Sequence, residues 1–292
     1  MQDWDHFRLI LALSRAGTVR GAAGLLGVNH ATVSRRLAQI NKQYGQVIFE
    51  RVAGGYKATH LGKQLIAAAE KMENISFSVI RQSRGSEPEI SGPITLSVPK
   101  PIAQFLLVDA LAKFTARHPK IDLTIETSYQ YVNLDRSEAD VVVRGTNNPP
   151  EHLVGRRLFP YALCHYCSAD YLANTPKDER KWLTFAPRNQ SQKWVATSPY
   201  PNAPIALHVD DLTYLHRAAI AGRGMIRGAC YMGDPEPKLT RLPGTKPTPI
   251  ADLWVLTHPD LRDTPKIKTL MKFLAETLNA KRDLIEGRAI GQ

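Results

Sequence analysis

The 292-residue sequence has few of the features that mark secreted, membrane-bound or metal-dependent proteins. It contains three cysteines, an odd number that does not suit a disulfide framework and fits a reducing compartment. It has no run of about 20 apolar residues that could span a bilayer. The N-terminal apolar stretch contains Arg8 and follows Asp3 and Asp5, unlike a signal peptide. We therefore expect a cytoplasmic protein that does not enter a membrane.

Motifs for catalysis and metal binding are also missing. The nine histidines show no H-E-x-x-H or comparable spacing, so we expect no metal and no other cofactor. Cys164 and Cys167 have C-x-x-C spacing, but no second pair completes a zinc site. Their segment alternates like a strand, which would point the two thiols to opposite faces. The glycines of AGRGMIRG follow a helix, whereas those of a dinucleotide loop open one.

Acidic residues are scarce near the N-terminus, and the positive charge is concentrated there. The chain has 38 Lys and Arg against 27 Asp and Glu, a formal net charge of +11. Between Arg15 and Lys63, eight basic residues are accompanied by one acidic residue, Glu50. Such a block attracts polyanions, including nucleic acid. The hydrophobic content of 43% is enough for two or three globular domains at this length.

Helical patterns fill the first 45 residues. Apolar spacing predicts a first helix that ends at Gly17, after which Thr18 can cap a second helix. Alanines in the second helix permit the close crossing that a helix-turn-helix requires. Asn29 can cap a third helix. The apolar face of the third helix is Val33, Leu37, Ile40 and Tyr44.

The opposite face of the third helix is polar and basic, which suits DNA. We expect His30, Thr32 and Arg35 to read base edges and Ser34 to hold a phosphate. Arg36 lies nearer the side of the helix and is the residue least expected to touch DNA. An ordinary amphipathic surface helix is the alternative interpretation. The predicted DNA-facing residues of this segment are Asn29, His30, Ala31, Thr32, Ser34 and Arg35.

The segment QVIFERVAGGYKATH predicts a hairpin, because two short extended stretches flank Gly54 and Gly55. A hairpin beside a helix-turn-helix forms a wing. Arg51, Tyr56 and Lys57 would place charge and an aromatic edge against the DNA backbone or minor groove. A surface hairpin with solvated charges is the alternative.

Thr59 can cap a long helix from about His60 to Arg84. Its apolar residues are separated by four and three residues in turn, a heptad pattern that predicts dimerisation through this helix. Packing on its own domain is the alternative, since three heptads separate the two periods poorly. The predicted dimer seam is Leu61, Leu65, Ala68, Met72, Ile75 and Val79. The apolar-poor segment SRGSEPEISGP then predicts a hinge.

From residue 94 onward, strand and helix patterns alternate. Residues 94–98 and 121–125 alternate as strands around a helical segment at 101–118, a βαβ unit of a largely parallel sheet. The residues of that helix expected to face inward are Phe105, Val108, Leu111 and Phe114. Further predicted strands are 141–144, 161–168, 183–185 and 253–257, and further predicted helices are 211–221 and 266–280.

The order of these motifs resembles the LysR-type transcriptional regulators over nearly the whole chain. The resemblance is carried by VNHATVSRRLAQINKQYG and IFERVAGGYKATHLGKQL, and then by GPITLSVP, DVVVRG, HLVGRRL, AAIAGRGM and KIKTLMKFLAETL. It implies an α/β protein with an N-terminal winged helix-turn-helix and an effector domain similar to periplasmic binding proteins. The implied divisions are a DNA-binding domain at 1–59, a linker helix at 60–84, a hinge at 85–93, and an effector domain at 94–292. That domain would have subdomain I at about 94–157 with 258–292, subdomain II at about 158–257, and a ligand cleft between them, with two crossover strands.

Position by position, the resemblance also implies individual roles. The residues implied to contact DNA or to secure the wing and linker helix are Thr18, Ser34, Arg35, Arg51 and Thr59. The chain departs from the family pattern at Asn41, where an acidic residue is usual, and at Arg223, where an apolar residue is usual. It also has IRGACYMG where the family usually has a proline-bearing turn.

The resemblance places an effector cleft at three segments of the C-terminal domain. The corresponding residues are Lys100, Pro101, Ile102, Ser128, Tyr129, Arg144 and Thr146. Convergence of Lys100 and Arg144 on one cleft favours a small organic anion, through charge-assisted hydrogen bonds. The alternative is that Arg144 pairs with an acidic neighbour such as Asp140 while Lys100 is solvated.

The function expected is sequence-specific regulation of transcription, modulated by a small-molecule effector. The expected partners are double-stranded promoter DNA, the effector, further copies of the chain in a homodimer or homotetramer, and RNA polymerase for an activator. No nucleophile or acid–base set indicates an enzyme. An α/β small-molecule-binding protein, or an enzyme with an accessory N-terminal domain, is the alternative, although neither explains the basic N-terminal block.

Overall fold

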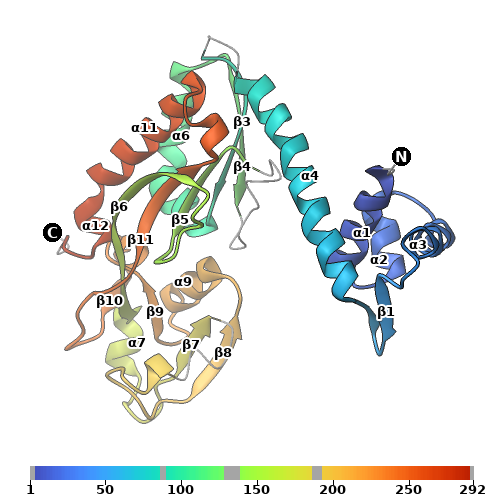
Figure 1. Cartoon of the computed structure of the whole chain (residues 1–292). Coiled ribbons are helices and arrows are strands. Elements are labelled where there is room, and N and C mark those ends of the chain that lie inside the picture. Colours follow the sequence, from blue (N-terminus) through green and yellow to red (C-terminus); the bar gives the residue numbers. More distant parts are fainter. Residues whose placement is uncertain (1–3, 86–89, 128–138, 186–192, 290–292) are drawn as a thin grey trace. The chain divides into compact units, whose positions relative to one another are not determined.

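The computed structural model describes residues 4–85, 90–127, 139–185 and 193–289 (Figure 1). The chain divides into two units, Met1–Arg81 and Gln82–Gln292. Most of the long helix α4 (His60–Gly85) therefore belongs to the N-terminal unit. Within the described residues, no helix is both long and apolar enough to cross a membrane.

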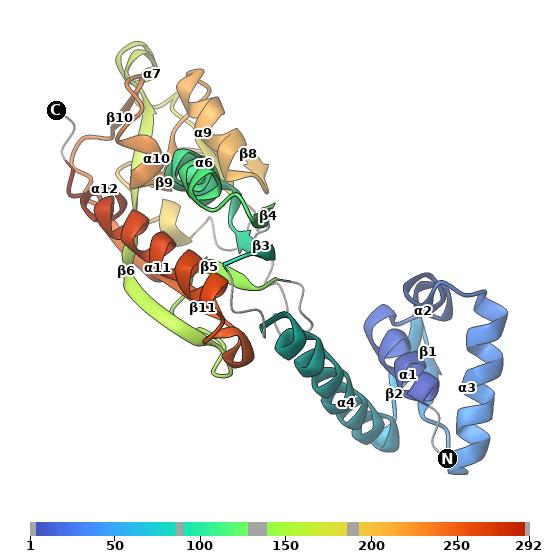
Figure 2. The same cartoon turned by 90° about the horizontal axis from the view of Figure 1, so that it is seen from above.

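The N-terminal unit groups helices α1, α2 and α3 with a small antiparallel hairpin (Figure 2). Its elements before α4 are α1 (Trp4–Ala16), α2 (Val19–Leu26), α3 (His30–Tyr44), β1 (Phe49–Val52) and β2 (Gly55–Ala58). The apolar positions predicted for α3 pack inward, with Val33, Leu37 and Ile40 fully buried. The pattern of a winged helix-turn-helix is therefore confirmed element by element.

Side-chain caps fix where the helices begin, as predicted. Thr18, Asn29 and Thr59 each accept a backbone N–H bond at the start of α2, α3 and α4, at 3.1, 2.9 and 3.1 Å. Gly27 ends α2 in the left-handed region, at φ 65°, where a side chain would be strained. The Thr59 hydroxyl also donates to the carbonyl of Ile48 at 3.0 Å, which ties the start of α4 to the hairpin.

The surroundings of helix α4 change along its length, and two residues of the predicted seam, Leu61 and Leu65, pack within their own unit. Leu65 and Ala69 are buried in the N-terminal core, and Leu61 packs against the same cluster. Arg15 of α1 donates to both carboxylate oxygens of Glu73, at 2.9 and 2.6 Å. The first part of the seam is thus covered by its own unit. The seam residues that remain exposed are Ala68, Met72, Ile75 and Val79.

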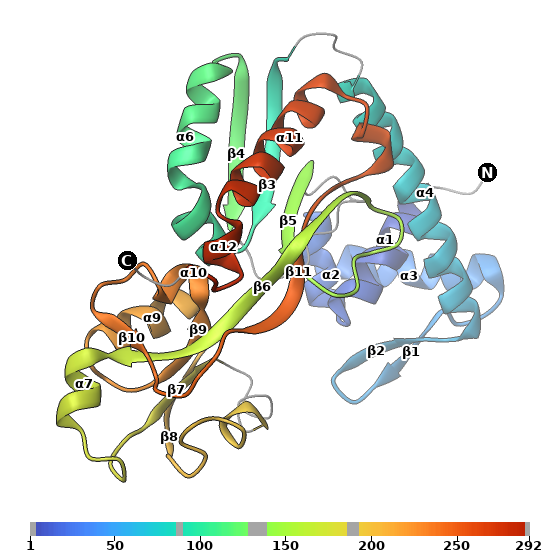
Figure 3. The same cartoon turned by 90° about the vertical axis from the view of Figure 1, so that its left-hand side faces the viewer.

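In the described part of the C-terminal unit, seven strands form one mixed sheet in the order β10-β6-β11-β5-β3-β4, with β9 paired to β6. Strand β3 runs parallel to β4 and β5, as the βαβ pattern predicts. The long strands β6 and β11 lie antiparallel to each other (Figure 3). The strands are β3 (Gly92–Val98), β4 (Ile121–Thr127), β5 (Val141–Gly145), β6 (Val154–Ser168), β9 (Ile226–Ala229), β10 (Leu239–Arg241) and β11 (Thr248–Thr257).

Strands β6 and β11 connect two subdomains. Subdomain I holds β3, β4 and β5 with α5 (Lys100–Ile102), η1 (Ala103–Leu107), α6 (Val108–Arg117), η3 (Pro259–Leu261), α11 (Pro265–Ala280) and α12 (Arg282–Ile285). Subdomain II holds β9 and β10 with α7 (Ala169–Asn174), β7 (Trp182–Phe185), β8 (Ile205–Val209), α9 (Leu212–Ile220) and α10 (Cys230–Gly233). Strands β7 and β8 pair in parallel.

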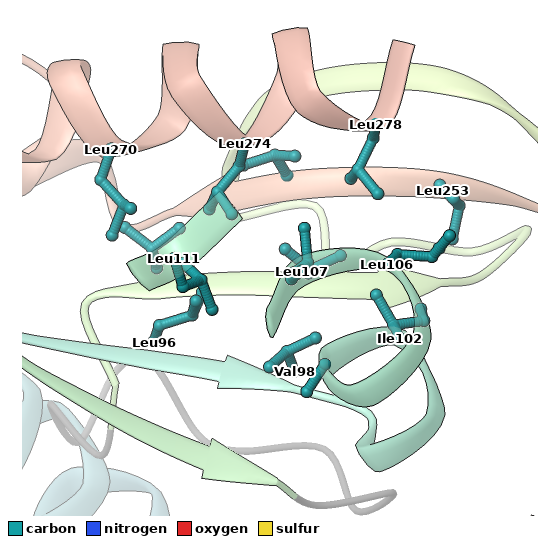
Figure 4. Packing of buried hydrophobic residues seen from close by; sticks show 14 of the residues in the cluster. Leu96, Val98, Ile102, Leu106, Leu107, Leu111, Leu253, Leu270, Leu274 and Leu278 are labelled. Carbon is teal, nitrogen blue, oxygen red and sulfur yellow. The ribbon is translucent and has the colours of Figure 1, made fainter. Parts of the chain in front are cut away.

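The core of subdomain I lies where α11 and the helices after β3 cover the sheet (Figure 4). Leu270, Leu274 and Leu278 line one side of α11 at a spacing of one helical turn and are completely buried. Burying a leucine side chain stabilises a fold by about 1.5–3 kcal/mol. The packing of these three leucines therefore helps to hold α11 on the sheet. The facing residues are Leu96, Val98, Ile102, Leu106, Leu107, Leu111 and Leu253.

The helix after β3 departs from the predicted pattern. Phe105 and Val108 were expected inside but are 36% and 57% exposed, whereas Leu106 and Leu107 are buried. The cause is the π-helical turn Ala103–Leu107, whose wider turn shifts the helical phase by a residue. The remaining predicted inward residues are buried: Leu111 and Phe114.

Candidate functional site

A shallow hollow on the N-terminal unit gathers residues from α2, α3 and the hairpin. Thr18, His30, Ser34, Arg51 and Tyr56, which the sequence predicts from separate segments, all line it. The other lining residues are Val19, Arg20, Val52, Gly54 and Gly55. Such a combination of cations, hydroxyls and an imidazole suits phosphates and base edges.

Sequence reasoning missed Arg20 as an individual site residue. It is exposed in the first turn of α2 and lines the same hollow as Thr18. Its position two residues after a capping threonine is the signal that could have identified it, since the start of this helix faces the hollow. Two basic side chains, Arg20 and Arg51, therefore line the hollow from different elements.

The two neighbouring arginines of α3 differ in their surroundings. Arg35 is exposed, and no ion pair is found for it within the described residues. Arg36 lies 3.7 Å from the carboxylate of Asp5 on α1, which suits a residue on the side of the helix. Among the other predicted DNA-facing residues, Asn29, Ala31 and Lys57 are exposed and Thr32 is half-buried, while Thr59 serves as the α4 cap.

A close backbone approach fixes the wing beside α2. The N–H of Tyr56 donates to the carbonyl of Gly17 at 2.8 Å. A Cβ at Gly55, where φ is +156°, would overlap that carbonyl oxygen. Glycine at position 55 is therefore needed for contact between the wing and the turn before Thr18. This contact holds Tyr56 at the rim of the hollow.

In the C-terminal unit, a cavity of about 410 Å³ is lined by residues of both subdomains. This volume is in the range of small-molecule sites. Pro101, Ile102 and Arg144, which the sequence predicts as effector contacts, all line it. Aromatic residues make up much of the remaining wall: Tyr161, Tyr166, Phe185, Trp194 and Tyr231.

Other predicted effector residues lie elsewhere. Lys100 is outside the lining, and its Nζ lies 2.7 Å from the Asp211 carboxylate at the start of α9. Thr146 is buried and outside the lining, and its carbonyl accepts a bond from the Trp254 indole at 3.0 Å. Ser128 and Tyr129 lie outside the described residues.

Arg144 is 6% exposed and is held by neighbours within subdomain I. Its guanidinium donates to the carbonyl of Val143 at 2.8 Å and to the Ser97 hydroxyl at 2.9 Å. The Asp140 carboxylate, considered as a partner from sequence, instead accepts the Thr95 N–H at 2.8 Å. Arg144 therefore presents a positive charge at the cavity wall while its orientation is set by the sheet.

Sequence reasoning missed the second arginine of the cavity, Arg227 of β9. It lies in the IRGACYMG segment, where the chain departs from the family pattern. Its guanidinium carbon is 5.9 Å from the centre of the Trp194 ring, and His165 of β6 is its partner across the strands. Burial lowers the pKa of Arg227, and the nearby Tyr161 opposes this shift. The position of Arg227 at the cavity follows from the pairing of β9 with β6, which local sequence patterns do not show.

Two contacts join subdomain I to helix α9 near the cavity. One is the ion pair between Lys100 and Asp211. The other is an edge-to-face contact between Phe105 and His216, with ring centres 5.2 Å apart. Phe105, which is 36% exposed, thus has an aromatic partner, His216, on the other subdomain.

The C-x-x-C cysteines pack into separate apolar clusters, as strand alternation predicts. Cys164 lies with Leu183 and Cys230, whereas Cys167 lies with Trp182. Burial is the largest cause that raises the pKa of the Cys167 and Cys230 thiols, each to about 11. These thiols are thereby kept from the thiolate form that redox and metal chemistry use. Within the described residues, no cluster of His, Cys, Asp and Glu could hold a metal ion.

Comparison with known sequences and structures identifies both units. Residues 4–63 match the family model of the bacterial regulatory helix-turn-helix protein, lysR family, and residues 88–279 match the LysR substrate binding domain. The chain is 25% identical over 283 residues to the Mau operon transcriptional activator of Paracoccus denitrificans, covering 94% of this chain and 96% of that protein. It is 31% identical over 150 residues to the transcriptional regulator DsdC of Escherichia coli, covering 51% and 48% respectively.

Solved structures share the fold over almost the full length. The structure of CrgA, a LysR-type regulator from Neisseria meningitidis, matches with a TM-score of 0.58 at 21% identity, covering 95% of this chain and 99% of that chain. The virulence activator AphB of Vibrio cholerae matches with a TM-score of 0.55 at 15% identity, covering 94% and 99%. The family comprises transcriptional regulators with a DNA-binding and an effector-binding domain, which excludes the enzyme alternative. The chain belongs to the LysR family of transcriptional regulators.

Proposed function

We propose that the hollow formed by α2, α3 and the wing is the surface that reads promoter DNA. The observation that carries this proposal is the convergence of Thr18, His30, Ser34, Arg51 and Tyr56 on one hollow. In this arrangement His30, Thr32 and Arg35 contact base edges. Thr18, Ser34 and the exposed Arg20 and Arg51 hold phosphates, and Tyr56 and Lys57 extend the contact along the wing.

We further propose that α4 is the dimer interface through its exposed stripe, Ala68, Met72, Ile75 and Val79. Two winged helices are needed to cover two half-sites, and this stripe leaves large apolar side chains in water. In this proposal residues 1–59 read DNA, 60–84 dimerise, 85–93 form the hinge, and 94–292 respond to the effector. Pairing of dimers would give a homotetramer.

The proposed effector is a small organic anion bound in the cavity between the subdomains. Support comes from the cavity volume of about 410 Å³ and from two arginines, Arg144 and Arg227, in its wall. A regulator of promoters acts where the chromosome lies, so we place it in the cytoplasm. If it activates transcription, as the name of its Paracoccus denitrificans relative states for that protein, RNA polymerase is a further partner.

The DNA-reading proposal is tested by comparing Arg35→Ala with its neighbour Arg36→Ala. A selected operator fragment is titrated with each variant in a gel-shift assay, and the oligomeric mass is checked by light scattering. Arg35→Ala is expected to weaken specific binding by about 1–3 kcal/mol, the contribution of a good base contact. Arg36→Ala is expected to bind as the unaltered protein does, because Arg36 faces Asp5. Equal losses in the two variants would refute the assigned roles.

A further inference from the structure

Two arginines, Arg144 and Arg227, bring positive charge to the cavity wall, and they differ in their surroundings. Lys100 lies outside the lining, and its Nζ pairs with the Asp211 carboxylate at 2.7 Å. Arg144 is directed by Val143 and Ser97. Arg227 lines the cavity, no carboxylate among the described residues pairs with it, and its guanidinium carbon lies 5.9 Å from the centre of the Trp194 ring.

The surroundings of Arg227 make an anionic ligand favourable. The side chain is half-buried, and a guanidinium that has lost part of its water is costly unless an anion replaces that water. His165, its partner on β6, stays neutral at physiological pH, because burial and then the charge of Arg227 lower the histidine pKa to about 4. His165 therefore neither competes with Arg227 for an anion nor supplies one.

The cavity wall that Arg227 shares is rich in aromatic rings. The rings of Tyr161 and Tyr166 lie against Gly145 and Gly233, at which a Cβ would overlap the rings. The Tyr166 hydroxyl already donates to Asp234 at 2.7 Å, so this residue offers the cavity its ring and not its hydroxyl proton. The Trp194 ring borders both the cavity and the guanidinium. A planar apolar body next to one anionic group matches these features.

We propose that the effector is an aromatic monocarboxylate whose carboxylate binds Arg227 and whose ring lies among Tyr161, Tyr166 and Trp194. The inference rests on the proposed function of this cavity as the effector site. One carboxylate is matched by Arg227. A second carboxylate would have to compete with the contacts that Arg144 makes to Val143 and Ser97, or with the ion pair between Lys100 and Asp211. The planar guanidinium can bind a carboxylate through two parallel hydrogen bonds.

Calorimetry on the full chain tests the ligand class directly. The probes are benzoate, salicylate, phenylacetate and indole-3-acetate, with benzamide and phenylacetamide as neutral counterparts and acetate as a carboxylate without a ring. At least one aromatic carboxylate is expected to bind about 30-fold or more tightly than its amide and than acetate. Equal binding of acid and amide, or no binding of any aromatic carboxylate, would overturn the proposal.

Two arginine variants then locate the carboxylate. Arg227→Gln is expected to weaken binding of the best carboxylate about 30-fold or more, and Arg227→Lys by less, since it keeps the charge but loses the planar fork. Arg223→Gln, an exposed arginine on the preceding loop, is the matched control and should bind as the unaltered protein does. Equal binding by Arg227→Gln and the control would assign the carboxylate elsewhere.

Two further measurements distinguish this inference from a structural role of Arg227 and from the proposed DNA-binding function. Without ligand, Arg227→Gln should melt at the same or a higher temperature than the unaltered protein, since it removes a half-buried charge; a lower melting temperature would indicate a structural arginine. The Arg223→Gln control should keep its operator affinity in gel-shift assays. Failure of the unaltered protein to bind operator would contradict the proposed function, whereas operator binding with no carboxylate response would contradict this inference.

Discussion

Asp211 performs two tasks near the cavity of the C-terminal unit. One carboxylate oxygen caps α9 by accepting the N–H groups of Thr213 and Tyr214 at 2.7 and 3.0 Å. The other accepts a bond from Lys100 of subdomain I at 2.7 Å. The hydrogen bonds from Lys100 and then Thr213 hold the pKa of this carboxyl well below its usual range. The residue thus links a helix start in one subdomain to the loop after β3 in the other.

Substitution Asp211→Asn separates these tasks, because asparagine keeps the cap but lacks the charge. At pH 7 we expect a loss of about 0.2–1 kcal/mol in the free energy of unfolding, the usual contribution of a partly exposed ion pair. The folded-state pKa is depressed, so this contribution is fully present above about pH 4 and is lost as the pH falls further. Urea unfolding at pH 7 and pH 3 measures the difference.

The neighbouring substitution Asp210→Asn is the control, since Asp210 is exposed and no ion pair of it is found in the described chain. It should leave the unfolding free energy nearly unchanged at both pH values. If Asp211→Asn and Asp210→Asn behave alike at pH 7, the ion pair between Lys100 and Asp211 contributes nothing to stability.

Individual residue roles could be predicted from sequence only where the partner is close along the chain. The caps at Thr18, Asn29 and Thr59 were predictable because each accepts a bond from two or three residues later. Lys100 was expected to be available for a ligand, yet its partner Asp211 lies 111 residues further on. Long-range pairs of this kind depend on how strands cross, which local patterns do not contain.

At the scale of elements, the wing depends on a single close approach. Substitution Gly55→Ala would push a methyl group into the Gly17 carbonyl oxygen. We expect it to destabilise the N-terminal unit by about 1–3 kcal/mol and to weaken operator binding, since the wing would be displaced from the hollow. Thermal unfolding and gel-shift assays measure the two effects.

Gly24→Ala serves as the matched control for this change. A Cβ at Gly24, in the interior of α2, would meet no atom within 4 Å. Alanine there should stabilise the helix by about 0.5–1 kcal/mol. Should Gly55→Ala be as well tolerated as Gly24→Ala, the wing would not need its contact with the turn at Gly17.

Helix α4 provides a test of assembly. Ile75 is 66% exposed on the proposed dimer stripe, and Ile75→Lys would place a charge at each side of a two-fold interface. We expect the variant to sediment with the mass of a single chain at concentrations where the unaltered protein sediments as a dimer or tetramer. Glu70→Lys puts the same side chain at an exposed position off the stripe and should not alter the mass. An unchanged mass for Ile75→Lys would place the interface elsewhere.

Elements were predictable where periodicity was regular and were misjudged where it was interrupted. Helix α11 matches its prediction to within a residue, since its leucines recur without a break. The π-helical turn at Ala103–Leu107 reversed the expected burial of Phe105. Strand β6 begins at Val154, seven residues before its predicted start, because the charged segment before Tyr161 does not alternate. That segment is held in the sheet by pairing with β11, including an ion pair from Arg157 to Asp252.

At the scale of the whole molecule, the two units carry different chemistry. The N-terminal unit combines a basic block with hydroxyl and imidazole groups on one hollow. The C-terminal unit encloses a cavity with an aromatic wall and two arginines. The class of molecule was predictable from motif order. Pro101, Ile102 and Arg144 of the cavity wall were also predicted, whereas the wall residues from β6, β9 and α9 were not, because only the fold brings these elements together.

The central claim is that the N-terminal hollow reads a specific promoter sequence. The most direct measurement is the affinity of the full chain for the promoter region beside its own gene, relative to a shuffled fragment of equal length, over a series of salt concentrations. We predict preference for the promoter by about 10³-fold or more. The logarithm of its affinity should fall with log salt by about 0.9 for each phosphate contacted. Equal affinity for the two fragments at every salt concentration would contradict the account.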